Sequence, residues 1–201
     1  MNYKNISAPY LDNVEIERRV ESFRNDFWDD KVPIEIEDII ELKLNIGIFP
    51  IIGFLKYSNM DALITSDWKN IYVDNDEYLN EHRNNRLRFS LAHEIGHFVM
   101  HKKIYENFGI KTKEDYYRLY RDIPERQYGY LESQANKFSS YLLIPRKVLS
   151  IEREKEFKSK YDPRFKKIDR LVLNSYLAKP LSKTFKVSEE AITIALKDIT
   201  P

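Results

Sequence analysis

The stretch "RFSLAHEIGHFVMH", residues 88–101, holds three of the four histidines of the chain. Apolar residues recur every three or four positions in it, which predicts an amphipathic helix over residues 86–101. On such a helix His93 and His97 lie one turn apart, about 6 Å along the axis. Both imidazoles can then bind one zinc ion. The alternative is a helix on which the histidines are only polar side chains.

Glu94 follows the first of these histidines and is turned about 100° around the helix axis from it. In that position its carboxylate can act as a general base toward a water that the metal activates. His-Glu-x-x-His is typical of zinc peptidases for this reason. Gly96 costs about 1 kcal/mol in a helix interior, which indicates that another backbone or a substrate approaches closely there.

A third ligand is needed, because a catalytic zinc ion usually has three protein ligands. The chain has no cysteine, so this ligand is expected to be a carboxylate. The best candidate is Glu132, which borders the apolar stripe of a helix predicted over residues 127–145 and ended by a proline. Asp122 and Glu125 are weaker alternatives, because each precedes the convincing helical pattern.

Small residues on this second helix favour close packing with the histidine helix. Ala135 and Ser139 leave room for the two backbones to approach, beside the apolar stripe that contains Leu131 and Phe138. A carboxylate beside a buried face needs a charged or metallic partner. The predicted ion would therefore also account for the position of Glu132.

The two remaining histidines are assigned other roles. His101 continues the ligand face but lies about 12 Å along the axis from His93. It is too far away to share the same ion, and we expect it to support a ligand or the structure. His82 is expected at the surface.

Hydrolysis at such a site also requires a donor to the oxyanion that develops on the substrate carbonyl. Four residues could provide it: Tyr128, Tyr130, Tyr141 and His101.

Around these two helices the sequence predicts an α+β fold. Helical spacing predicts helices over residues 12–28, capped by Asp12 or Asn13, and over residues 35–44. Short apolar runs between polar residues predict a small, mostly antiparallel three-stranded sheet from segments 45–57, 61–66 and 69–75. Pro50 is expected at an edge or a bulge. Residues 70–76, "NIYVDND", are the candidate edge for pairing with an extended substrate.

The C-terminal part of the chain is predicted to be helical. We divide the chain into a metallopeptidase domain at residues 1–150 and a helical extension at residues 151–201. A helical piece is also expected at residues 113–120. The chain closes with two short helices, for which Pro180 suits a first position and Ser188 an N-cap. We expect this pair to pack on the catalytic domain rather than to read DNA.

Composition excludes some classes of function. The 201 residues are 42% hydrophobic, which is enough for one domain with its own core, and the net charge is +1. This balance predicts no general attraction to nucleic acid or to a membrane. The sequence contains no basic-then-apolar signal and no long apolar run, so a cytoplasmic location is expected.

Two segments together carry a resemblance. "RLRFSLAHEIGHFVMH", residues 86–101, and "ESQANKFSSYLLIP", residues 132–145, resemble the paired motifs of the ImmA/IrrE family of zinc metallopeptidases. The likeness covers about residues 33–150. It implies a zincin-like α+β fold with one Zn²⁺ ion, held by His93, His97 and Glu132, and with Glu94 as the catalytic base. It also implies an endopeptidase that cuts a DNA-binding repressor or an antitoxin, which releases the repressed genes.

Two other functions compete with this prediction. The chain could be a zinc-stabilised regulator that binds a repressor or DNA without cutting it, although such a protein has no need of Glu94. It could also be an aminopeptidase or another metallohydrolase that acts on small substrates. Manganese or iron could replace zinc in a site of two histidines and one carboxylate.

Overall fold

The structure is a computed structural model that describes residues 3, 6–58, 60–80, 83–159 and 170–199. It has the α+β composition that the sequence predicts, with helices around one small sheet. The strands are β1 (Gly47–Ile51), β2 (Ala62–Ile64) and β3 (Asn70–Asp74). The helices are α1 (Asn13–Phe27), α2 (Ile36–Asp38), the π-helical turn η2 (Ile39–Lys43), α3 (Phe54–Ser58), α4 (Asn75–Leu79), α5 (Asn84–Met100), α6 (Lys102–Tyr105), α7 (Lys113–Asp122), α8 (Glu125–Leu143), α9 (Arg146–Ser159), α10 (Arg170–Phe185) and α11 (Glu189–Ile199).

The sheet is mixed rather than mostly antiparallel. Its order is β1-β3-β2, with β1 parallel and β2 antiparallel to β3. The prediction that residues 70–76 form an edge is therefore wrong, because β3 pairs on both sides. Ile71 and Val73 of this strand are fully buried, as expected for a central strand. Pro50 does lie on an edge strand, β1, where its missing N–H costs no ladder bond.

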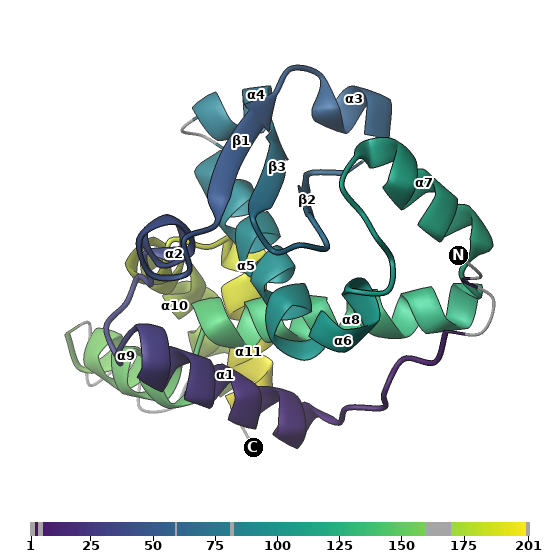
Figure 1. Ribbon diagram of the computed structural model, residues 1–201. Coiled ribbons are helices and arrows are strands. Elements are labelled where there is room, and N and C mark those ends of the chain that lie inside the picture. The colour runs from purple at the N-terminus through teal and green to yellow at the C-terminus, as the bar shows by residue number, and fades with distance from the viewer. Residues whose placement is uncertain (1–2, 4–5, 59, 81–82, 160–169, 200–201) are drawn as a thin grey trace.

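Helices α5 and α8 form the centre of the molecule. They pack against each other, β2 packs on α5, and α1 packs on α8. In Figure 1 the sheet lies above α8 and α1 lies below it. The predicted stripe of α8 is buried along its whole length, at Leu131, Ala135, Phe138 and Leu142. The two central helices therefore hold the candidate residues of the site on a packed scaffold.

The ends of the elements agree with the predictions in part. Asp12, one of the two predicted caps, is the N-cap of α1 and accepts from the backbone N–H of Glu15 at 2.8 Å. Helix α5 begins at Asn84, two residues before the predicted start at residue 86, and its N-cap residue Arg83 makes no side-chain cap. The predicted helix over residues 35–44 forms as α2 followed by η2, and only the middle of segment 45–57 is a strand.

The C-terminal helices pack on the rest of the chain. Arg88 of α5 donates from Nε to the carbonyl of Lys186 at 3.2 Å, between α10 and α11. Phe185 is fully buried in the common core. Ser188 caps α11 as predicted, whereas Pro180 lies inside α10 rather than at its start. The division of the chain at residue 150 stays a prediction.

No helix in the described part of the chain combines the length and the apolar character needed to cross a bilayer. The predicted surface position of His82 falls outside the described residues.

Candidate metal centre

The structure brings the two histidines of α5 to one point. The Nε2 atoms of His93 and His97 lie 2.9 Å apart. His97 is buried and His93 is partly exposed, so the pair faces a cavity from the protein interior. The predicted helix supplies this geometry directly, because positions four apart share a face.

Glu132 of α8 completes the group. Its carboxylate oxygens lie 3.3 Å from Nε2 of His93 and 3.5 Å from Nε2 of His97. Ligands about 2.0–2.1 Å from a tetrahedral zinc ion are separated by about 3.3–3.4 Å. The three separations bracket this value, so the donor atoms fit a metal ion. Within the described residues, neither Asp122 nor Glu125 belongs to a group of this kind.

The electrostatics of the group favour a cation. Burial lowers the pKa of His93, but its hydrogen bond to Glu132 and the charge of Glu94 raise it, to about 9. Burial raises the pKa of Glu132, but the hydrogen bonds with both histidines bring it well below its usual value. Both shifts show that positive charge is stabilised between these side chains. A metal ion would supply that charge.

Gly96 allows the two helices to approach. A Cβ atom at this position would lie 3.1 Å from the Cα and 3.2 Å from the carbonyl oxygen of Ala135. The prediction of a close backbone neighbour is therefore confirmed, and that neighbour is α8. Because Glu132 precedes Ala135 by three residues, the same contact sets its distance from the histidines.

A series of hydrogen bonds supports His97 through Nδ1, the ring nitrogen that does not face Glu132. The carbonyl of Pro9 can only accept, so Nε2 of Gln134 donates to it at 2.7 Å and Oε1 of Gln134 faces His101. Nε2–H of His101 donates to that oxygen at 2.9 Å. Burial lowers the pKa of His101 to about 3, so its ring is neutral and its Nδ1 accepts from Nδ1–H of His97 at 2.9 Å. These directions leave the lone pair of Nε2 of His97 free for a metal.

His93 has a similar support on α8. Its Nδ1 lies 2.9 Å from Oδ1 of Asn136, which can only accept a hydrogen bond. This contact holds one proton on Nδ1, so the proton that a bound metal ion would displace is the one on Nε2, which faces Glu132. Both candidate ligands thus have a hydrogen-bond acceptor at Nδ1 and direct Nε2 toward the metal position, as a metal site requires. The predicted supporting role of His101 agrees with its position.

Glu94 lies at the same cavity but outside the ligand group. It is almost fully buried, and its Oε2 accepts from the backbone N–H of Ile64 on β2 at 2.8 Å. Burial raises the pKa of Glu94. A carboxylate with a raised pKa is a stronger base when it is ionised, which suits proton transfer near neutral pH.

Tyrosines also line this cavity, which has a volume of about 240 Å³. Of the four candidate oxyanion donors only Tyr128 lines it; His101 is bonded behind His97, and Tyr130 accepts from Arg126 at 2.8 Å. Tyr116 is a further residue of the cavity that was not predicted from the sequence, and its hydroxyl lies 2.5 Å from that of Tyr128.

Burial raises the pKa of both phenols, so they remain protonated donors. The sequence signal that could have identified Tyr116 is the repeat of tyrosine four positions apart on the charged helix α7, at Tyr116 and Tyr120.

Comparison with known proteins adds an independent observation. The family model described as IrrE N-terminal-like domain, a peptidase family, matches residues 78–197. The match covers more than half of the chain and includes α5, α8 and all the candidate site residues. None of the curated proteins matches the sequence. The α+β fold agrees with the zincin-like fold implied by the resemblance. The chain therefore belongs to the ImmA/IrrE family of peptidases.

Proposed function

We propose that this protein is a zinc-dependent endopeptidase that hydrolyses a peptide bond in a cytoplasmic protein. The observation that supports this most strongly is the convergence of His93, His97 and Glu132 beside the separate, buried carboxylate of Glu94. Two imidazoles and one carboxylate are a typical ligand set of catalytic zinc, with a position left open. Zinc, when bound, supplies Lewis acidity that polarises a carbonyl and lowers the pKa of water.

Glu94 moves the proton in this proposal. Its carboxylate takes a proton from the attacking water and passes it to the leaving amine. The backbone N–H of Ile64 donates to Oε2 of Glu94 at 2.8 Å. This contact orients the carboxylate and leaves its other oxygen, Oε1, to accept the proton. A protein that only bound its partner would gain nothing from a second buried carboxylate here, since burial without full pairing is costly.

The substrate would bind along β2, the edge strand nearest to Glu94. The N–H of Thr65 donates to the carbonyl of Asn70, and the carbonyl of Asp61 accepts from the N–H of Asp74. The backbone groups of these odd-numbered residues therefore point toward β3. Because neighbouring residues of a strand point their backbone groups to opposite sides, Ala62 faces the open edge. A substrate strand can pair there. This replaces the predicted edge at residues 70–76.

Tyr128, held by Tyr116, is the proposed donor to the oxyanion. Both phenols line the cavity together with Ala62 and Leu63 of β2, and burial keeps them protonated. A neutral hydroxyl in a water-poor site can stabilise developing negative charge strongly.

The proposed substrate is a helix-turn-helix repressor or an antitoxin, which the family resemblance implies. The test is incubation of the zinc-loaded protein with a small repressor encoded beside its gene. Fragments are expected with the parent protein and none with Glu94→Gln, which should still bind zinc. A stable complex without fragments would support the non-cleaving regulator instead. Release of single amino acids from short peptides would indicate an aminopeptidase.

A further inference from the structure

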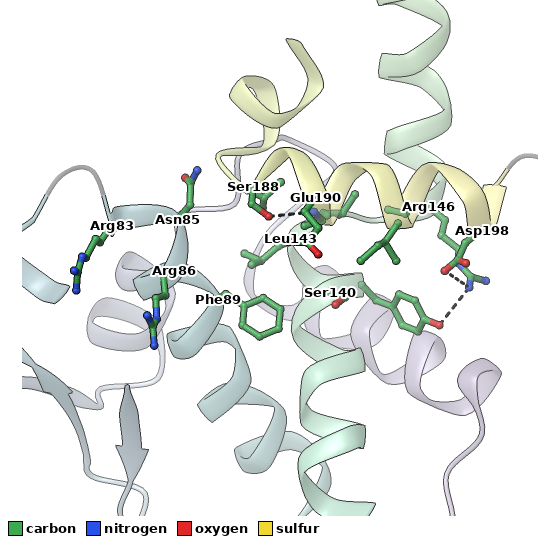
Figure 2. Close-up of a pocket in the computed structure, with 16 residues that line it drawn as sticks. Arg83, Asn85, Arg86, Phe89, Ser140, Leu143, Arg146, Ser188, Glu190 and Asp198 are labelled. Carbon is green, nitrogen blue, oxygen red and sulfur yellow. Dashed lines mark hydrogen bonds and ion pairs between the residues drawn. The ribbon is translucent and has the colours of Figure 1, made fainter. Parts of the chain in front are cut away.

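A second and larger cavity lies next to the metal centre. It has a volume of about 640 Å³, is open to solvent, and is lined by the first turns of α5, the last turns of α8 and one face of α11. Figure 2 shows Phe89, Leu143 and Ser140 facing it from the two central helices, beneath α11. Its volume lies within the range of about 300–1,000 Å³ that is typical of ligand sites.

The two cavities adjoin each other. Phe89 lines both of them. Arg86, which lines the larger cavity, forms an ion pair at 2.7 Å with Asp61, which lines the metal cavity. A chain bound at the metal centre can therefore continue past Phe89 into the larger cavity.

Two contacts fix the direction of that path. Asp61 lies beside Arg86, and Ile64 lies beside Glu94. Strand β2 thus runs alongside α5 in the same direction, from the larger cavity toward the metal centre. A substrate paired antiparallel to β2, the more stable pairing per residue, runs the opposite way. Its residues C-terminal to the cut bond then point toward the larger cavity.

The length of the path follows from helix geometry. Phe89 and Asn85 precede His93 by four and eight residues, which is about 6 and 12 Å along the axis. An extended chain advances about 3.3 Å per residue. The larger cavity is therefore reached about two to four residues from the cut bond.

The lining is suited to apolar side chains. Leu143, Ile144, Val187, Ala191 and Ile194 contribute apolar surface to it. The arginines at the rim have acidic partners: Arg83 pairs with Glu77, Arg86 with Asp61, and Arg146 with Asp198 and Glu17. With its charges paired in this way, the rim offers little attraction to an anionic ligand.

We propose that the larger cavity is a specificity site that binds a large apolar side chain of the substrate, about two to four residues C-terminal to the cut bond. This inference rests on the proposed endopeptidase function. The site sets which sequences are cut, and the metal centre performs the cut.

The test uses the zinc-loaded protein and a peptide mixture obtained by digesting a cell lysate with another protease. Mass spectrometry of the new ends gives the residue preference at each position around the cut. Ile194→Asp places a charge on the wall of the cavity and should preserve the fold, because Ile194 is 56% exposed. Ala191→Trp fills the cavity. Ile151→Asp, at a residue 49% exposed on α9 and outside both linings, is the matched control.

The parent and the control are expected to prefer leucine, isoleucine, phenylalanine or methionine at these C-terminal positions. Both cavity variants should cut such peptides about tenfold more slowly and lose the preference, with zinc content unchanged. An absent preference, or one that survives both variants, would overturn the proposal. Equal slowing of all peptides would overturn it as well and would indicate a regulatory small-molecule site. No cleavage at all by the zinc-loaded parent would contradict the endopeptidase function, and the specificity site with it.

Discussion

His97 and His101 face each other through their Nδ1 atoms, 2.9 Å apart, and both rings are buried. The pair connects a candidate metal ligand to the N-terminal segment, since Gln134 links His101 to the carbonyl of Pro9. Each of the three hydrogen bonds that link Pro9, Gln134, His101 and His97 has a defined donor and acceptor. The folded protein therefore prepares Nε2 of His97 as a ligand before any metal binds.

This relationship predicts a metal-affinity effect at a residue that touches no metal. Gln134→Leu leaves Nε2–H of His101 without an acceptor and should weaken zinc binding about 10- to 100-fold. Gln127→Leu is the matched control, because Gln127 also holds the N-terminal segment, through the N–H of Ala8 at 2.7 Å, but does not contact the histidines. Competition with a chromophoric chelator measures both affinities. Equal affinities in the two variants would show that the hydrogen-bond chain does not support the site.

The helix contact at Gly96 predicts opposite effects of one substitution at two glycines. Gly96→Ala places a Cβ atom 3.1 Å from the backbone of Ala135. Overpacking costs about 1–3 kcal/mol, which should outweigh the gain of about 1 kcal/mol in helix propensity. At Gly129 a Cβ atom would meet nothing within 4 Å, so Gly129→Ala should stabilise the protein by up to about 1 kcal/mol.

Urea unfolding of the zinc-free proteins measures both changes. Gly96→Ala should also bind zinc more weakly, because the contact sets the separation of α5 and α8. Stabilisation of similar size in both variants would show that the two helices separate without cost.

The hydrogen bonds of Arg88 are expected to anchor the C-terminal helices to α5. This buried side chain donates to the carbonyls of Ile34, at 2.7 Å, and Lys186, at 3.2 Å. Arg88→Met leaves both carbonyls without a donor and should destabilise the protein by about 2–3 kcal/mol. Arg86→Met removes an exposed ion pair from the same helix and should cost less than about 1 kcal/mol. Thermal unfolding compares them, and equal losses would contradict the anchoring role.

The assignment of the oxyanion donor predicts a kinetic difference between two tyrosines of α8. Tyr128→Phe should lower kcat about a hundredfold and leave zinc content unchanged, because Tyr128 lines the metal cavity. Tyr130→Phe should have little effect, since its hydroxyl is bonded to Arg126. Cleavage of a substrate peptide by each variant provides the measurement. Full activity of Tyr128→Phe would exclude the assignment.

The sequence predicted those parts of the site that depend on helical periodicity. Both histidines, Glu94 and the position of Glu132 follow from the spacing of residues on two helices and from the resemblance of their motifs. The close contact at Gly96 also follows from the energetic cost of glycine in a helix.

The sheet order could not be predicted in this way. Three short apolar runs look alike in sequence, and only long-range pairing decides that β3 is central and β2 is the edge. The π-helical turn η2 has no periodic signal of its own. The series of hydrogen bonds that links Pro9 to His97 joins segments more than 80 residues apart in the sequence. It therefore becomes visible only in the folded structure.

The most direct test of the account is the zinc content of Glu132→Ala, compared with the parent and with Glu94→Gln after exhaustive dialysis. Elemental analysis should find about one ion per chain in the parent and in Glu94→Gln, and almost none in Glu132→Ala with its fold preserved by circular dichroism. A full complement of zinc in Glu132→Ala would contradict the proposed metal centre.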